Sequence, residues 1–295
     1  MRLWILLLAL TLTIARPGLA EEKTIYGGQP IADAGVTLGS WGSGSAEQST
    51  SRVLVGTASI KITTEGWFEG GSIEFASPVT VFAGAPGASE YLVFTVAPTM
   101  QMEIPGSAQD TGPFGGSKTS GSYDFGAEQV SAPKVKAVRV VLVNGQGKRM
   151  EFKEPLTPTG DPTWWRAAIP LAKLKGASEE YSLKRLLLFG DVADTMYLGS
   201  VKVIEDNEPL QADLSEDQSL AVGDSAVLNS NATGGVSAVK CAWDFDDQDG
   251  VQEDAVGQIV RHVYNTGGDY TVTLTVTDVN GVKLPIQKTV KVHIE

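Results

Sequence analysis

Short runs of alternating apolar and polar residues are the feature that most constrains how this chain folds. The clearest runs, each bounded by Gly, Pro, Asn or Asp, are residues 58–62, 72–75, 138–140 and 271–276. A period of two places successive side chains on opposite faces of a strand, whereas an amphipathic helix repeats every three to four residues. Only 171–174 and 182–187 could form a helical turn, and the 33 glycines suit many turns. The sequence therefore predicts an all-β protein.

The first twenty residues predict a secretory signal peptide. Arg2 precedes an uncharged apolar run over 3–14, and Gly18 and Ala20 form a small-x-small cleavage site. A membrane anchor would need about 20 apolar residues, whereas this run stops before Arg16. No later stretch is apolar enough to span a membrane. We therefore expect a secreted protein, extracellular or periplasmic, whose mature chain has no transmembrane segment.

The mature chain is expected to be strongly acidic. The whole sequence has a formal net charge of −12, and removal of Arg2 and Arg16 with the signal peptide leaves 21 basic against 35 acidic residues, or −14. An acidic surface repels nucleic acid and anionic lipid, so neither is an expected partner. The single cysteine, Cys241, excludes an intramolecular disulfide, so stability must come from burial of apolar side chains.

A domain boundary is predicted at 205–209, where the strand-like segment 201–204 ends in charged residues and a proline. At 295 residues the chain is long enough for two domains with separate cores. The predicted parts are a signal peptide at 1–20, a larger domain at 21–207 and a smaller domain at 208–295.

The smaller domain contains two strand motifs in sequence order. The first spans 241–250 and begins Cys-Ala-Trp-Asp-Phe-Asp, and the second spans 262–278 and reads His-x-Tyr-x-x-x-Gly-x-Tyr-x-Val-x-Leu-x-Val-x-Asp. Both resemble motifs of the PKD domain family. The resemblance implies an immunoglobulin-like β-sandwich that acts as a spacer or adhesion module, and we expect a bacterial source. The expected core residues of this domain are Trp243, Phe245, Tyr264 and Tyr270.

A cluster of aspartates in the first motif invites comparison with calcium-binding loops. Its members are Asp244, Asp246, Asp247 and Asp249. An EF-hand frame here would begin at Phe245 and end at Val256, so that motif is excluded. Turn chemistry accounts for the cluster better, because Asp side chains accept hydrogen bonds from nearby backbone amides. Weak calcium binding stays open, and no other cofactor is expected.

The larger domain resembles secreted jelly-roll modules of the galactose-binding-like superfamily, which includes many carbohydrate-binding modules. The resemblance rests on the segments 24–28, 39–42, 66–71 and 196–203. In related modules, acidic residues near the first strand and within the last strand often hold calcium. Here Gly27-Gly28 and Gly199-Ser200 stand at those places, so calcium is not expected there.

Carbohydrate binding is usually carried by exposed aromatic rings that stack on the apolar faces of sugar units. The candidates are Trp41, Trp67 and Trp164, together with Phe114 and Tyr123 in the Gly- and Ser-rich segment 105–129. That segment is either a flexible insertion or a binding loop. The adjacent Trp164 and Trp165 point to opposite faces of an extended strand, so we expect Trp165 in the core and Trp164 facing water.

Catalysis is not expected, and catalytic site residues are not assigned. The larger domain has no histidine and no cysteine, which excludes Ser-His, Cys-His and histidine-based metal chemistry there. A carboxylate pair such as Asp191 with Asp194 could still act on glycosides. The leading hypothesis is a secreted, non-catalytic protein whose jelly roll binds extracellular carbohydrate or a surface polymer. The alternatives are a purely structural cell-surface or matrix component and a carbohydrate-active lyase or glycosidase.

Overall fold

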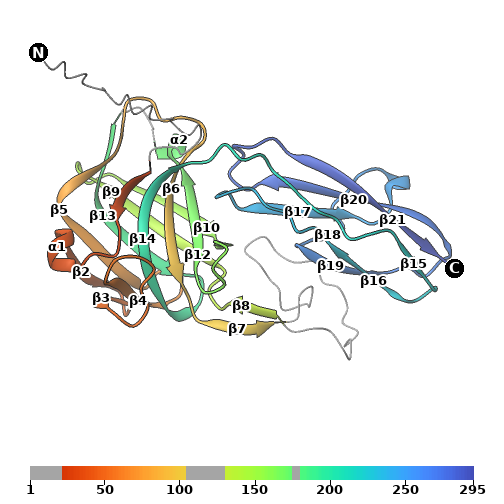
Figure 1. Cartoon of the computed structure of the whole chain (residues 1–295), viewed down its shortest axis with the longest axis horizontal. Helices are drawn as coiled ribbons and strands as arrows, with labels where there is room; N and C mark the ends of the chain where they lie inside the picture. The colour runs from red at the N-terminus through yellow and green to blue at the C-terminus, as the bar shows by residue number, and fades with distance from the viewer. Residues whose placement is uncertain (1–21, 104–129, 175–179) are drawn as a thin grey trace, which may run out of the picture.

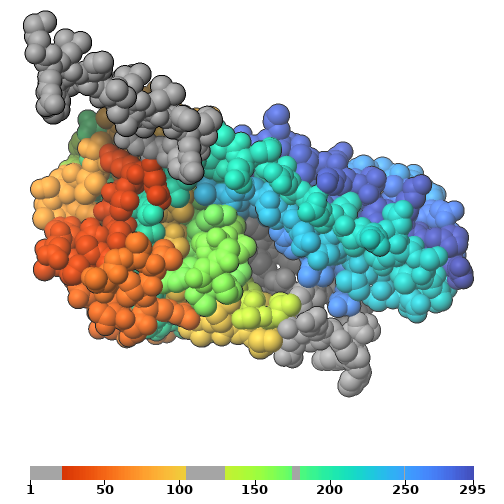
Figure 2. Space-filling view, in the orientation of Figure 1, coloured from red at the N-terminus to blue at the C-terminus, as the bar shows by residue number. Residues whose placement is uncertain are grey.

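Two β-sandwiches follow one another along the chain and are arranged end to end along the long axis of the molecule (Figures 1 and 2). The computed structural model describes residues 22–103, 130–174 and 180–295. The predicted all-β architecture is confirmed, since almost every described element is a strand. None of the helices in these described ranges is long and apolar enough to cross a membrane. The predicted signal peptide lies outside them.

The N-terminal sandwich consists of a seven-stranded and a five-stranded sheet. The first has the order β11-β12-β6-β14-β4-β3, with β1 paired to β14. Its strands are β1 (Lys23–Tyr26), β3 (Ser45–Ser49), β4 (Ser59–Glu65), β6 (Glu90–Ala97), β11 (Thr157–Pro158), β12 (Trp165–Pro170) and β14 (Ala193–Glu205). The second has the order β10-β9-β13-β5-β2. Its strands are β2 (Val36–Trp41), β5 (Gly70–Ala83), β9 (Ala137–Asn144), β10 (Arg149–Pro155) and β13 (Glu180–Gly190).

The chain passes repeatedly from one sheet to the other, as in a jelly roll. The antiparallel pair of β7 (Met100–Glu103) and β8 (Val130–Pro133) extends from the sandwich, and the helices α1 (Ile31–Ala34) and α2 (Leu171–Leu174) are single turns. The helical turn expected at 171–174 is therefore α2. The alternative expectation at 182–187 is wrong, because this segment belongs to β13. A bulge between Leu183 and Arg185 turns both Leu183 and Leu186 inward, which imitates helical spacing.

The core between the two sheets is built from the inward residue of each alternating pair. Its largest members with no more than 1% exposure include Ile60, Ile62, Phe94, Leu142, Ile169, Leu183 and Leu186. Burial of one such side chain stabilises the fold by about 2 kcal/mol. The outward residues of the five-stranded sheet form a second, separate apolar cluster of Val141, Leu187, Phe189 and Trp41.

The C-terminal sandwich places a five-stranded sheet of order β15-β21-β20-β17-β18 against the pair β16-β19. The elements are β15 (Gln218–Leu220), β16 (Ser225–Asn229), β17 (Val239–Asp244), η1 (Asp247–Asp249), β18 (Ala255–Val256), β19 (Ile259–Val263), β20 (Gly268–Asp278) and β21 (Ile286–Ile294). Trp243, Phe245 and Tyr264 are buried and Tyr270 is half-buried against them. Trp243 Nε1 donates to the carbonyl of Gly257 at 2.8 Å, which satisfies the polar atom of its ring.

The junction between the sandwiches contains a buried ion pair. Lys283 Nζ donates to Asp206 Oδ2 at 2.6 Å, and to the carbonyl oxygens of Glu208 and Gly234 at 2.6 and 2.7 Å. The side chains of Lys283 and Asp206 are only 8% and 5% exposed. Gly235 has a φ of +60°, and a Cβ there would lie 2.3 Å from the Asp206 carboxylate, so the close approach requires glycine.

A second polar contact closes the same junction. Asn280 Nδ2 donates to Glu154 Oε2 at 3.2 Å and to the carbonyl of Ala168 at 3.3 Å. Glu154 is 4% exposed, and this burial raises the pKa of its carboxyl from 4.5 to about 7. Ser237 Oγ donates to Tyr91 Oη at 3.0 Å. The two sandwiches therefore meet through paired polar groups rather than through a flexible linker alone.

Candidate functional site

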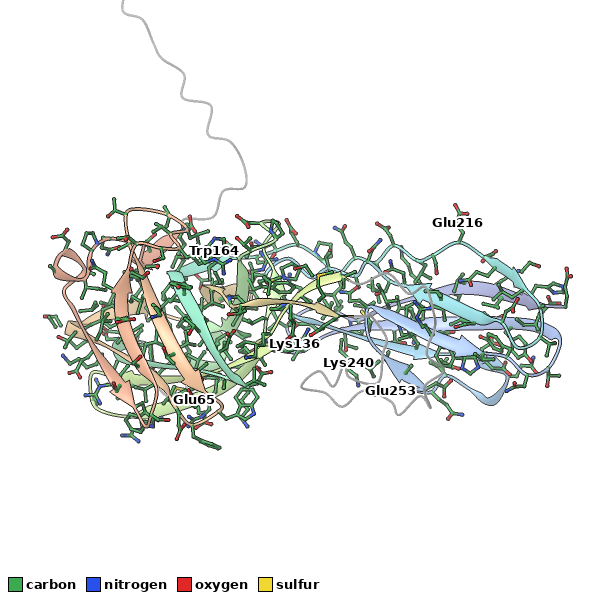
Figure 3. All side chains as sticks on the ribbon, turned by 90° about the horizontal axis from the view of Figure 1, so that it is seen from below. Glu65, Lys136, Trp164, Glu216, Lys240 and Glu253 are labelled. Carbon is green, nitrogen blue, oxygen red and sulfur yellow. The ribbon has the colours of Figure 1, made fainter. Side chains whose placement is uncertain are left out.

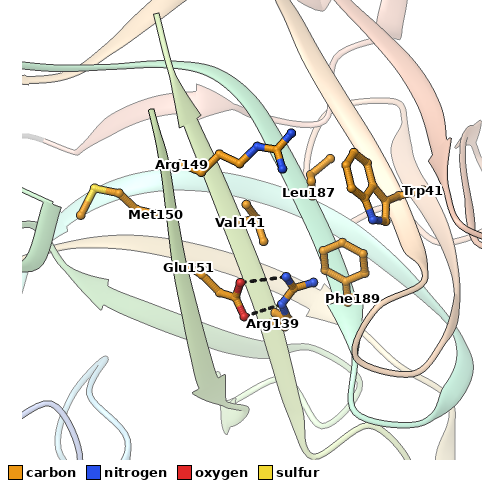
Figure 4. Close-up of a pocket in the computed structure, with 8 residues that line it drawn as sticks. All are labelled: Trp41, Arg139, Val141, Arg149, Met150, Glu151, Leu187 and Phe189. Carbon is orange, nitrogen blue, oxygen red and sulfur yellow. Dashed lines mark hydrogen bonds and ion pairs between the residues drawn. The ribbon is translucent and has the colours of Figure 1, made fainter. Parts of the chain in front are cut away.

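Exposed aromatic and charged side chains gather on the outer face of the five-stranded sheet of the N-terminal sandwich, which has the order β10-β9-β13-β5-β2. A hollow of about 230 Å³ opens there (Figure 4). Its lining residues are Trp41, Arg139, Val141, Arg149, Met150, Glu151, Leu187 and Phe189. Closed ligand pockets usually measure roughly 300–1,000 Å³, so this hollow can hold only part of a ligand, and the rest must lie along the surface. We call this region the outer-sheet face.

Arg139 on β9 organises the outer-sheet face. Its Nε and Nη2 donate to the two carboxylate oxygens of Glu151 at 2.6 and 2.8 Å, and its Nη1 donates to the carbonyl of Trp67 at 3.0 Å. The guanidinium carbon lies 4.7 Å from the ring centre of Phe189 and 5.2 Å from that of Phe68. These contacts fasten the turn that carries Trp67 and Phe68 to the sheet.

The aromatic residues of the face come from two neighbouring connections. Trp41 ends β2, while Trp67 and Phe68 lie in the turn between β4 and β5, where Gly66 and Glu69 form a bridge. Ser43 Oγ donates to Glu69 Oε2 at 2.6 Å and ties the two connections together. Phe68 is 68% exposed, and Trp41 and Trp67 are half-buried. The face therefore presents three aromatic rings, and the hydrogen bonds of Arg139 and Ser43 anchor the connections that carry them.

Two cations lie above these rings. The guanidinium carbon of Arg149 is 5.7 Å from the ring centre of Trp41, and Nζ of Lys153 is 4.8 Å from that of Trp67. Both side chains belong to exposed positions of β10, the first and the fifth residue of the strand, and their alternation with Met150 and Phe152 sets them on the outer face. Hydrogen bonding from Arg139 lowers the pKa of Glu151, which lies between them in sequence.

The expected position of Trp164 is wrong. Its side chain is 4% exposed, within the N-terminal sandwich (Figure 3), and a Cβ on Gly199 would lie 2.6 Å from its ring. Trp164 therefore packs against the bare backbone of β14 and presents no ring to a ligand. Trp165 is partly buried against the main core, as expected. Gly199 is therefore needed for the close packing of the Trp164 ring.

The remaining candidates fall into two groups. Phe114 and Tyr123 lie outside the described residues. Trp41 and Trp67 are brought to one face, and Phe68, Arg139 and Phe189 join them although the sequence did not single them out as site residues. The signal that could have found the cations is the pattern Arg149-x-Glu151-x-Lys153, which marks one charged face of a strand.

The aspartate cluster of the C-terminal sandwich is engaged in turns. Asp244 accepts from the backbone N–H groups of Asp246 and Gln252, each at 3.0 Å, and Asp246 accepts from Gln248 N–H at 3.2 Å. Asp247 is exposed at the start of η1, which also contains Asp249. In the described ranges, no group of three or more His, Cys, Asp or Glu side chains is arranged to hold a metal ion. Weak calcium binding stays a prediction.

The carboxylates considered for glycoside chemistry are also engaged with backbone. Asp191 accepts from Lys136 N–H at 3.2 and 3.3 Å, and burial raises the pKa of its carboxyl. Asp194 accepts from Thr99 N–H at 3.0 Å. Both side chains therefore hold loops at the end of the sandwich.

Several solved structures resemble the chain at low identity. The glycoside hydrolase domain of Endo-D from Streptococcus pneumoniae R6 is 12% identical, with a TM-score of 0.33 over 86% of this chain and 37% of that chain. The CBM22-1–GH10 modules of a Clostridium thermocellum xylanase complexed with xylohexaose are 11% identical, with a TM-score of 0.30 over 70% and 34%. The fibronectin(III)-like modules of Clostridium thermocellum CbhA are 11% identical, with a TM-score of 0.24 over 57% and 83%. The chain spans about a third of the length of the first two structures.

The C-terminal sandwich also matches a known family by sequence. No curated protein matches the chain. A family model described as PKD domain matches residues 207–294, a range that contains β15 to β21 and both of the motifs on which the resemblance rests. The resemblance is therefore confirmed, and residues 207–294 of this chain form a PKD domain.

Proposed function

We propose that this protein is a secreted, non-catalytic binding protein that holds a carbohydrate polymer on the outer-sheet face. The observation that carries the proposal is the gathering of Trp41, Trp67 and Phe68 on one face beside a shallow hollow. Aromatic rings with an apolar face and a fixed orientation are suited to stacking on sugar rings. The PKD domain then acts as a spacer that holds this face at a set orientation, through the polar junction around Asp206 and Lys283.

The acid–base properties of the face favour binding over catalysis. A glycosidase needs one carboxylic acid that stays protonated near neutral pH and a second carboxylate across the substrate. Glu151 lines the hollow, but its pKa is lowered because both carboxylate oxygens accept hydrogen bonds from Arg139. Glu154, whose pKa is raised to about 7, is buried at the junction between the sandwiches. Neither residue is placed to act as the proton donor.

Trp41→Ala and Trp67→Ala are each expected to weaken binding to the preferred polysaccharide by about thirtyfold. A central aromatic contact is worth about 2 kcal/mol, and each truncation removes one stacking platform. The measurement is affinity electrophoresis and calorimetry of residues 21–295 against soluble and insoluble polysaccharides, with sugar release followed in parallel.

The matched control is Leu284→Ala, which truncates an apolar side chain that is 85% exposed on the other sandwich. It should bind like the wild type. Binding that survives loss of both tryptophans would place the site elsewhere. Release of sugar would replace the binding role by a catalytic one, and absence of binding to every polymer would favour a structural surface component.

A further inference from the structure

The outer-sheet face carries two cations, Arg149 and Lys153, that form no direct ion pair with a carboxylate. Arg139 is paired with Glu151, and Arg185 is paired with Glu74 at 2.5 Å. Hydrogen bonds from these arginines lower the pKa of Glu151 and of Glu74, so both acids stay ionised and neutralise their partners. Within the described residues, the side chains of Arg149 and Lys153 make neither an ion pair nor a hydrogen bond, although Lys153 lies close enough to Glu151 to help lower the pKa of that carboxyl.

The positions of these two cations coincide with the two tryptophan platforms. Arg149 lies over Trp41 and Lys153 over Trp67, so each stacking surface has one positive group above it. Four residues along an antiparallel strand separate their Cα atoms by roughly 14 Å. Two acidic groups on different units of one polymer can reach them.

The free cations also act against neutral ligands. A cation above a ring occupies the surface on which a sugar would stack, and a neutral sugar that displaces it offers no charge in return. A carboxylated sugar draws the cation off the ring and forms an ion pair with it while its own ring stacks on the exposed tryptophan. Discrimination of this kind combines an attraction for one ligand with a penalty for the other.

We propose that the outer-sheet face selects a polymer of uronic acids, with sugar rings on Trp41 and Trp67 and carboxylates on Arg149 and Lys153. The proposal rests on the proposed function and names the ligand class of the same site. The net charge of −14 of the mature chain repels a polyanion at long range, but at physiological salt charges farther away than about 8 Å are largely screened. The two local cations therefore decide the attraction.

The test compares polygalacturonate, its fully methyl-esterified form and a neutral xylan, with the full mature chain. The wild type should bind polygalacturonate at least tenfold more tightly than either neutral polymer, and the preference should shrink as sodium chloride is raised. The double variant Arg149→Gln/Lys153→Gln should lose that preference and bind the neutral polymers as well as, or better than, the wild type. Both positions are exposed, so the thermal midpoint should not change.

The control variant is Lys291→Gln, which removes an exposed charge from β21 of the PKD domain and should leave every affinity unchanged. Equal wild-type affinity for charged and esterified polymers would overturn this inference while leaving the proposed function standing. Unchanged polygalacturonate binding by the double variant would also overturn it, and so would tighter binding to a sulfated neutral-backbone polymer. Absence of binding to any polymer would overturn both proposals.

Discussion

Lys283→Met is expected to lower the free energy of unfolding by about 3 kcal/mol, because the buried Asp206 carboxylate loses its ion-pair partner while Arg166 acts on it only at longer range. The side chain of Asp206 is only 5% exposed, and Lys283 also donates to two backbone carbonyls that would lose this donor. Val236 N–H and Glu208 N–H still hold the carboxylate in place, so it cannot turn outward to water easily. Urea unfolding at pH 7, followed by tryptophan fluorescence, measures the change.

An exposed ion pair in the same sandwich provides the comparison. Lys240 Nζ lies 2.6 Å from Glu253 Oε2, with side chains 32% and 50% exposed (Figure 3). Lys240→Met should cost less than about 1 kcal/mol, because water solvates the carboxylate that remains. The double variant Asp206→Asn/Lys283→Met should recover part of the stability, since neither member of the ion pair then stays buried without the other. A loss below about 1 kcal/mol in Lys283→Met would mean that the junction opens to water.

Several strand positions could be predicted from the sequence because apolar and polar residues alternate along them with a period of two. The runs at 58–62, 72–75 and 271–276 were predicted as strands and fall in β4, which begins at Ser59, in β5 and in β20. At 182–187 the prediction left a helical turn open, because a bulge places two inward leucines three residues apart. A bulge is set by pairing with the neighbouring strands, and single-strand patterns do not contain that information.

The face on which a tryptophan lies was harder to predict than the presence of a strand. Trp164 and Trp165 are adjacent, and alternation only says that they differ in direction. The structure buries Trp164 because Gly199, 35 positions away in sequence, leaves room for its ring. Trp41 and Trp67 were identified as candidates, but their cationic neighbours come from β9 and β10. Only the pairing of distant strands brings Arg139 to the turn that holds Trp67.

Stability is expected to fall by about 3 kcal/mol as the pH rises from 4.5 through 7, because of Glu154. Burial raises the pKa of its carboxyl from 4.5 in the unfolded chain to about 7 in the folded protein. Below pH 4.5 the carboxyl is protonated in both states and contributes nothing. Between these values the folded state holds the proton that the unfolded state releases, so each rise in pH favours unfolding. Urea unfolding at intervals from pH 4 to 8 measures the slope.

Glu154→Gln isolates this contribution, because the amide oxygen can still accept from Asn280 and carries no charge. The variant should match the wild type near pH 4 and exceed its stability by up to about 3 kcal/mol at pH 8. Glu151→Gln, on the same strand, should act in the opposite direction, since the pKa of Glu151 is lowered and its charged form is the one that Arg139 stabilises. Parallel curves for Glu154→Gln and the wild type would mean that water reaches this carboxyl, and therefore that the two sandwiches separate at their junction in solution.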